Sequence, residues 1–327
     1  PYNKKIHVLN PKQVNKFKLS YNDLPKNDYV DSFVIADCLR FGRINKEVYL
    51  DDYRYAALKN LTRARFFAVQ NLTREKQRFM NHLFKKYSTM AQEKVFSDTF
   101  STTALAVYES FESAEALANM DLHQLTEFII EKGKKRFPDP DSVAKAIQKA
   151  ARSSYRLPKT VNDSVNQVLS ISISSMRAME SQIKAFDKAI AEQMALIPNT
   201  LTSVKGIGPV YSAGIIAEIG DINRFPTQAS LAKYAGLVWS QHQSGDFEAQ
   251  NTRMIHSGNR YLKYYLCEAA LSLVRCDAEY RSFYHRKYKE VNKYQHKRAL
   301  ALTARKLVRL VFRLLKDNCL YRAPESK

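Results

Sequence analysis

The chain has 327 residues, of which 52 are Lys or Arg and 32 are Asp or Glu, so its formal net charge is +20. An excess of this size indicates a polyanionic partner, nucleic acid before membrane, and small acidic substrates do not require it. Only 9 Gly and 10 Pro interrupt a chain that is 45% hydrophobic, which favours long helices and argues against β-sandwiches, collagen-like repeats and disorder.

The charge is concentrated at the two ends of the chain. Residues 1–90 carry 18 basic and 8 acidic side chains, and residues 251–327 carry 18 and 6, whereas residues 91–250 carry 16 and 18. Two separate basic blocks predict contacts with nucleic acid, although basic helices with merely solvated faces are the alternative for each helix taken alone.

Zinc-binding, disulfide, secretion and membrane motifs are not recognisable in the sequence. The four Cys residues stand far apart, with no CxxC pair and no Cys/His cluster, so we expect neither a zinc site nor a disulfide framework. No run reaches the roughly 18 apolar residues of a membrane span, and no signal peptide opens the chain. We therefore expect a cytoplasmic protein in a reducing compartment, without a membrane partner.

The N-terminal segment predicts a short strand over 5–9, a polar helix to about residue 19 and a second helix that ends near Gly42. Because the strand has no fold before it, we expect a further piece to precede Pro1. Asp28 and Asp31 lie three residues apart, so the second helix places both carboxylates on one side near its start. They are candidate ligands for a divalent metal, and helix capping is the alternative.

Another brief strand is predicted over 48–50, followed by a long basic helix from about 51 to 87. We expect the basic side chains of this helix to face outward, namely Arg63, Arg65, Arg74, Lys76, Arg78, Lys85 and Lys86. Residues 91–195 are predicted to be helical, with breaks at Pro138, Pro140 and Pro158. The last of these helices, about 161–196, has an apolar stripe that suits a coiled coil within the chain, a coiled coil between chains, or an ordinary helix pair.

The sequence pattern changes after Pro198, where glycines enter a helical sequence. The turn Gly206-Ile207-Gly208 precedes a helix over Tyr211–Ile219, a pattern typical of a helix-hairpin-helix, in which glycines let backbone N–H groups approach a phosphate. Lys205, Gly206 and Gly208 are therefore candidate nucleic-acid contacts. A tight turn without a ligand is the alternative.

The C-terminal block supplies a candidate hydroxyl and several candidate phosphate contacts. Ser244 precedes Gly245 in a loop, and basic residues follow it at Arg253, Arg260 and Lys263, so Ser244 could be presented to a phosphodiester, although a Ser-Gly pair is also an ordinary turn. The last helix repeats basic residues at helical spacing, and we expect them to contact nucleic-acid backbone: Arg298, Arg305, Lys306, Arg309 and Arg313.

Five short motifs occur in a recognisable order: Lys26-Asn27-Asp28-Tyr29-Val30-Asp31, Val204-Lys205-Gly206-Ile207-Gly208-Pro209, Tyr234-Ala235-Gly236-Leu237, Gln243-Ser244-Gly245 and Ser257-Gly258-Asn259-Arg260-Tyr261-Leu262. Together they resemble the signature blocks of the insertion-sequence-one-ten family of transposases, DEDD-type recombinases guided by a bridge RNA, whose relatives include the Piv DNA invertases. The resemblance covers essentially the whole chain.

The resemblance implies a role for each matching residue. Asp28 and Asp31 match the last two acidic residues of the DEDD tetrad, which bind Mg²⁺, and Ser244 matches the serine that attacks DNA and forms a phosphoserine intermediate. Ser240 and Ser257 lie close enough to remain alternatives. The first Asp and the Glu of the tetrad should precede Pro1, so the chain supplies half of the metal site.

The resemblance also implies an architecture that is mainly α with a partial α/β element. We expect the C-terminal part of a RuvC-like (RNase-H-like) domain over 1–90, a helical coiled-coil domain over 91–196 and a helical transposase domain with the helix-hairpin-helix over 197–327. The implied function is RNA-guided cutting and rejoining of donor and target DNA in a bacterial or archaeal cell, by a dimer or tetramer that associates with the nucleoid when active. A non-catalytic nucleic-acid-binding protein and a metal-dependent structure-specific nuclease are the alternatives.

Overall fold

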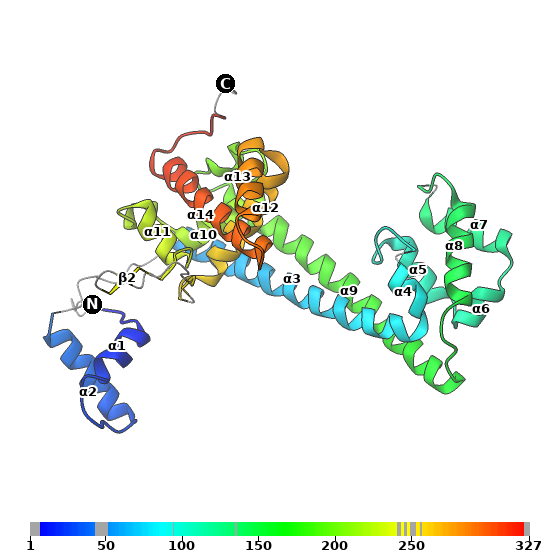
Figure 1. Cartoon of the computed structure of the whole chain (residues 1–327), viewed down its shortest axis with the longest axis horizontal. Coiled ribbons are helices and arrows are strands. Elements are labelled where there is room, and N and C mark those ends of the chain that lie inside the picture. The colour runs from blue at the N-terminus through cyan, green and yellow to red at the C-terminus, as the bar shows by residue number, and fades with distance from the viewer. Residues whose placement is uncertain are drawn as a thin grey trace.

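The computed structural model of the chain describes residues 7–42, 52–93, 95–134, 136–240, 243–244, 247–248, 253–255 and 257–323. These residues are mainly helical, as the composition predicts. Figure 1 shows an elongated molecule, in which two long helices cross the middle, short helices gather at one end and the C-terminal helices gather at the other. The strand predicted over 48–50 lies outside the described residues. Of the one predicted over 5–9, the described part, 7–9, forms no strand.

The N-terminal unit is a pair of helices, α1 (Pro11–Lys18) and α2 (Asp28–Arg40). Each helix begins after an Asn whose side chain accepts a hydrogen bond from the first turn, Asn10 from the Lys12 amide and Asn27 from the Val30 amide. The hydroxyl of Tyr21, after α1, donates to the buried carboxylate of Asp37 on α2. Both helices therefore begin at a side-chain cap, and a polar contact joins them.

The two long helices are α3 (Tyr53–Lys86) and α9 (Lys159–Met194), and they pack side by side along the molecule (Figure 1). Arg65 pairs with Asp187 at 2.5 Å, whereas Lys76, further along α3, pairs with Glu180 at 3.4 Å. Later positions on α3 thus meet earlier positions on α9, so the helices are antiparallel. The apolar stripe predicted for α9 packs against α3 of the same chain.

The expected outward orientation of the basic residues on α3 is wrong in part. Lys86 is almost fully buried and its ammonium donates to the carbonyl of Tyr108 at 2.9 Å. Arg63 and Arg65 are both held in ion pairs by neighbouring helices. The reason is that both α9 and α10 pack on α3. Less of its surface is therefore exposed to solvent than on a helix that packs against a single neighbour. The residues that do face outward are Arg74, Arg78 and Lys85.

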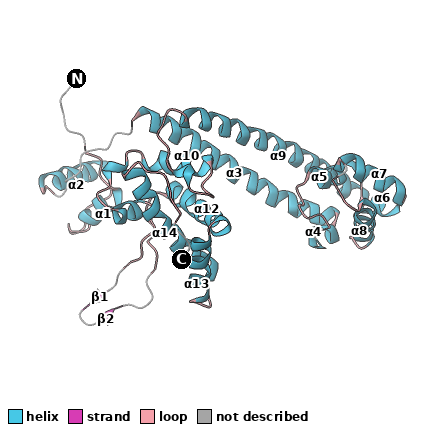
Figure 2. Ribbon diagram, turned by 90° about the horizontal axis from the view of Figure 1, so that it is seen from above, coloured by secondary structure: helices cyan, strands magenta, loops and turns pink. Residues whose placement is uncertain are grey.

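Five short helices form the end of the molecule distant from the C-terminal helices, as Figure 2 also shows. Ser101, Ser113, Asp121 and Asp139 cap four of them, and Pro140, predicted as a break, is the first residue of the last. Their core includes Phe79 of α3. The helices are α4 (Ser88–Glu93), α5 (Thr102–Ser110), α6 (Ala114–Asn119), α7 (Leu122–Gly133) and α8 (Pro140–Arg152).

The C-terminal helices enclose a second hydrophobic core, to which α3 contributes Leu58 and α9 contributes Ile190. Among the described residues, no helix combines the length and the apolar character of a membrane span. The elements are η1 (Leu201–Ser203), α10 (Pro209–Ile219), η2 (Ile222–Arg224), α11 (Gln228–Tyr234), β1 (Gln243–Ser244), β2 (Phe247–Glu248), α12 (Arg260–Cys276), α13 (Ala278–Lys289) and α14 (Gln295–Lys316).

The glycine turn before α10 follows a single 3-10 turn, η1, where the sequence predicts a full helix. Gly206 has a φ of +108°, a conformation that glycine adopts without strain, and a Cβ there would lie 3.3 Å from the Cβ of Cys276. Gly208 caps α10 and has open space around it. The turn is therefore exposed at Gly208 and packed at Gly206.

We predict that Lys86 makes the stability of the protein rise with pH above neutrality. Burial lowers the pKa of Lys86 to about 8, from an ordinary value near 10.5. Because the unfolded chain then binds more protons than the folded chain, the free energy of unfolding rises between about pH 8 and pH 10.5, by up to about 3 kcal/mol. Chemical denaturation of wild type and Lys86→Met across this range measures the difference.

Lys85→Met is the matched control, because Lys85 is the exposed neighbour of Lys86. The wild-type curve should rise relative to that of Lys86→Met and run parallel to that of Lys85→Met. Parallel curves for all three proteins would contradict the proposed cost of burying the ammonium.

Candidate functional site

Two glycines bring the motifs at 234–237 and 257–262 together. Gly236 and Gly258 have φ values of +70° and +133°, and a Cβ on Gly258 would lie 2.6 Å from the Cα of Gly236. No side chain fits in that space, so the two backbones touch only because both residues are glycine. The Asn259 amide also donates to the Tyr234 carbonyl at 2.7 Å. The segment before α12 is thereby fixed against the end of α11.

A buried carboxylate, Glu218 on α10, lies beside this glycine contact. Arg63 of α3 binds it through two hydrogen bonds of 2.7 and 2.8 Å, and the side-chain amide of Asn259 donates to it at 2.7 Å. Asn259 also caps α12, because its side-chain oxygen accepts from the amides of Tyr261 and Leu262. A fully buried charge requires such partners, and here they come from two other helices.

An open pocket of about 590 Å³ lies over this cluster. Lys233 and Arg260 are exposed beside it, and the guanidinium of Arg260 stacks on the rings of Phe67 and Tyr261, with no acidic partner among the described residues. Glu218 neutralises Arg63, so Lys233 and Arg260 provide the uncompensated positive charge. The lining residues are Asn10, Arg63, Lys233, Tyr234, Ile255, Ser257, Gly258, Asn259, Arg260 and Tyr261. Such a pocket can bind an anion.

A hairpin that carries Ser244 starts at the edge of this pocket. Its base is antiparallel: the Ile255 amide donates to the Val238 carbonyl, and the Ser240 amide donates to the Arg253 carbonyl at 2.8 Å. Further out, β1 pairs with β2 and Ser244 lies opposite Phe247. Figure 2 shows β1 and β2 away from the helical body. The hydroxyl of Ser240 is already bound to the Arg253 carbonyl, at 3.0 Å.

Asp28 and Asp31 both lie in the first turn of α2, as predicted. Asp28 is exposed, while Asp31 pairs with Lys18 at 2.7 Å and lines a separate pocket of about 900 Å³, whose lining residues all lie between His7 and Ile35. In Figure 2, α2 and the β1–β2 hairpin both lie at the left of the view, with the hairpin below α2. In the part of the chain that the structure describes, no three His, Cys, Asp or Glu side chains gather as they would around a metal.

The other predicted nucleic-acid contacts are distributed over several surfaces. Lys205 is exposed at the glycine turn, Arg253 is exposed at the hairpin base, and Lys263 is half-buried on α12. On α14, Arg305 donates to Gln228 at 2.6 Å and Arg309 is exposed. Three others from α14 lie near carboxylates: Arg298 pairs with Glu290, Lys306 with Glu279, and Arg313 lies 3.7 Å from Asp317.

Sequence reasoning did not single out Arg63, Glu218 or Lys233 as site residues. A signal for Glu218 does exist, because it is the one charged residue in the otherwise apolar or small run Val210–Ile219, and a charge in a buried helix needs a partner. No local pattern identifies Arg63 as that partner, since 155 positions separate the two residues.

Comparison with known families decides what kind of protein has this site. A family model described as "Transposase IS116/IS110/IS902 family" matches residues 199–285, which include the glycine turn, the hairpin and all of the pocket lining except Asn10 and Arg63. A second, the model of DEDD transposases of the IS110 group, matches residues 2–87, which include Asp28 and Asp31. The chain belongs to this transposase family.

Individual relatives of this transposase are encoded by insertion elements. The 44.8 kDa protein of insertion element IS116 from Streptomyces clavuligerus is 26% identical over 322 residues, which cover 94% of the chain and 75% of that protein. The 43.6 kDa protein of IS110 from Streptomyces coelicolor is 33% identical over 44% of the chain and 34% of its own length. A probable family 20 transposase from Pseudomonas aeruginosa is 32% identical over 31% of the chain and 28% of its own length.

We predict that Gly258→Ala destabilises the C-terminal helices of the transposase. The new Cβ would lie 2.6 Å from backbone atoms of Gly236, and an Ala at a φ of +133° is strained. We expect a loss of about 2 to 4 kcal/mol in the free energy of unfolding, measured by denaturant titration. Gly208→Ala is the control: its φ is −75° and its Cβ would meet nothing within 4 Å, so a similar loss there would contradict the argument.

Proposed function

We propose that this insertion-element transposase cuts and rejoins DNA with Ser244 as its nucleophile. The observation that carries the proposal is the position of β1, on a hairpin whose base borders a pocket with two uncompensated cations, Lys233 and Arg260. A phosphodiester bound to those cations would lie near the foot of the hairpin. Ser240 is a weaker candidate, since its hydroxyl is already engaged at the hairpin base.

The proposed step conserves its atoms and charges. The Ser244 oxygen forms a bond to phosphorus while the bond from phosphorus to one deoxyribose oxygen breaks. The serine proton passes to solvent or to a base, and the departing oxygen takes up a proton. A hydroxyl of another DNA strand reverses the step and releases the serine. Cationic side chains stabilise the negative charge that develops on the phosphate oxygens.

Asp28 and Asp31 fit a magnesium ion that is shared with a phosphate. Mg²⁺ is commonly bound by one or two carboxylates together with substrate phosphate oxygens, and these two residues offer carboxylates from one helical turn. The ammonium of Lys18 lies 2.7 Å from Asp31, so a magnesium ion that uses this carboxylate would have to displace that ammonium. When bound, Mg²⁺ would supply positive charge to the reacting phosphate.

The proposed site is shared between copies of the chain. The pocket that Asp31 lines contains no residue of the β1–β2 hairpin, so the carboxylates of one protomer would meet the serine of another. A dimer or tetramer assembled on donor and target DNA satisfies this requirement. The surface charge of +20 suits such an assembly, and a structured guide RNA that pairs with the DNA would supply its sequence specificity.

The test of the nucleophile is the covalent adduct with DNA. Ser244→Ala should abolish both the adduct and strand exchange, and should leave the affinity for DNA within about twofold, since a small loop side chain contributes little to a charge-dominated interface. Ser240→Ala and Ser257→Ala are matched controls that should retain both activities. If Ser244→Ala kept both activities and Ser257→Ala lost them, the nucleophile would be Ser257, which lines the pocket. If all three variants kept both activities, the proposed serine chemistry would be wrong.

Variants of the acidic pair test the metal. Asp28→Asn and Asp31→Asn should each remove strand exchange, and additional Mg²⁺ should restore it in part at most. Cutting without any covalent adduct would instead favour a metal-dependent nuclease.

The guide RNA is tested by the nucleic acid that copurifies with the protein. We expect a discrete structured RNA to remain bound at moderate salt and to be released as salt increases, because phosphate contacts dominate the affinity. RNA sequencing of the purified complex identifies it. Purification without RNA, together with retained DNA binding, would support a protein that binds DNA without a guide.

A further inference from the structure

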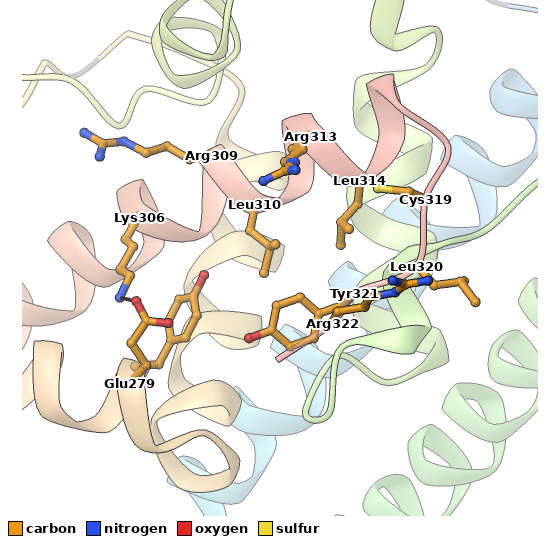
Figure 3. A pocket seen from close by; sticks show the side chains of 11 residues that line it. Glu279, Lys306, Arg309, Leu310, Arg313, Leu314, Cys319, Leu320, Tyr321 and Arg322 are labelled. Carbon is orange, nitrogen blue, oxygen red and sulfur yellow. Dashed lines mark hydrogen bonds and ion pairs between the residues drawn. The ribbon is translucent and has the colours of Figure 1, made fainter. Parts of the chain in front are cut away.

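A second pocket, of about 680 Å³, lies between α13, α14 and the C-terminal tail, far from the glycine contact in sequence (Figure 3). Neither the hairpin nor the acidic pair contributes to it. Leu310 and Leu314 project from α14 toward its centre, and the ring of Tyr321 faces them from the tail (Figure 3). The pocket therefore has an apolar floor on a helix that the sequence analysis assigned only to phosphate contacts.

The tail is held in place by specific bonds, so the pocket is a built feature. Asn318 has a φ of +47° and turns the chain back over α14, and the Cys319 amide donates to the Leu314 carbonyl at 3.2 Å. The Tyr321 amide then donates to the hydroxyl of Ser203 at 2.9 Å. These contacts fix Tyr321 as one wall.

Three arginine side chains belong to the lining of this pocket. Arg309, Arg313 and Arg322 are exposed at its edge. The carboxylate of Glu279 is the one acidic side chain of the lining, and the ammonium of Lys306 binds it at 2.5 Å (Figure 3). Arg309 forms no ion pair within the described part of the chain. The edge of the pocket thus keeps a net positive charge.

We propose that this pocket binds one unpaired nucleotide of a single-stranded nucleic acid, with the base on the apolar floor and the phosphates on the guanidinium groups. Single strands are bound by this combination of a ring or apolar platform for the base and a cationic edge for the backbone. The volume lies in the range of pockets that enclose small organic ligands. A paired duplex does not expose a base to such a floor.

An acidic peptide could pair with the arginines at the edge of the pocket, but it would not account for the apolar floor. Carboxylate side chains have no flat apolar group to bury against Leu310 and Tyr321, whereas every nucleobase has one. The family also works on DNA, so the nucleic acid needs no additional partner. The same chemistry fits a strand of DNA or of RNA, and the experiment below distinguishes them.

The test compares strands that have equal charge but differ in their bases. Fluorescence anisotropy gives the affinity of the whole chain for a labelled oligothymidine, an oligouridine and an abasic strand of the same length. We expect the better of the two base-bearing strands to bind at least about fivefold more tightly than the abasic one, since stacking contributes about 1–3 kcal/mol per base. Whether thymidine or uridine is preferred identifies DNA or RNA as the source.

Two variants assign that preference to this pocket. Tyr321→Leu keeps an apolar side chain but loses the ring, so the preference for bases should disappear, whereas Tyr321→Phe, which keeps the ring, should retain it. In the double variant Arg309→Gln with Arg322→Gln, the slope of log affinity against log salt concentration should become shallower by about 1.4. This is the change expected when two phosphate contacts on a single strand are lost. Lys293→Gln with Lys297→Gln removes the same charge from exposed residues outside the pocket, and should change the salt dependence less.

Three results would overturn the proposal. The first is equal affinity of wild type for base-bearing and abasic strands, and the second is a base preference that persists in Tyr321→Leu. The third is a salt dependence that falls equally in the arginine and lysine pairs. The proposal would also be contradicted if an acidic peptide of the same charge displaced the labelled strand as effectively as unlabelled oligothymidine does. No arm requires strand exchange, so the outcome is independent of Ser244.

Discussion

The C-terminal half of the structure depends on how one buried carboxylate, Glu218, is satisfied. A buried charge without partners would cost several kcal/mol, so α10 can pack in the core only where Arg63 and Asn259 reach it. These two residues belong to α3 and to the start of α12. The position of the long helix relative to the C-terminal helices is therefore fixed by a polar contact as well as by apolar packing. The net contribution of such a pair to stability is small, but the loss of one partner costs about 3–5 kcal/mol.

The contact between Gly236 and Gly258 fixes the geometry of the candidate site, because it lies next to Asn259. Because Asn259 both binds Glu218 and caps α12, the residues just before it are held against Gly236 without freedom to separate. Lys233 and Arg260 then border one pocket although they come from different helices. We propose that the reacting serine lies on a hairpin that starts at this rigid base. In that arrangement the proposed phosphate-binding surface is fixed, and the nucleophile is carried by a separate segment.

The positive charge of the chain serves structure as well as binding. On α3, Arg63 and Arg65 join helices, and Lys86 is buried, so these cations are not available to a nucleic acid. On α14, ion pairs hold Arg298 and Lys306. Among the exposed cations that remain, Lys233 and Arg260 border the pocket beside the glycine contact, and Arg309 and Arg322 border the pocket beneath the tail. Their positions, more than the total charge, are the basis for the phosphate contacts that we propose.

The sequence by itself determined the helices and the family. Apolar repeats of three or four residues are local properties that predicted α2, α3 and α9 near their observed bounds, and the order of short motifs indicated the transposase family. Only the tertiary structure decided which basic residues are engaged, that α9 pairs with α3 of the same chain, and that Arg63 meets Glu218. The physical reason is that these contacts join positions more than a hundred residues apart. Their partners depend on how whole helices pack, which no local pattern of charge or hydrophobicity encodes.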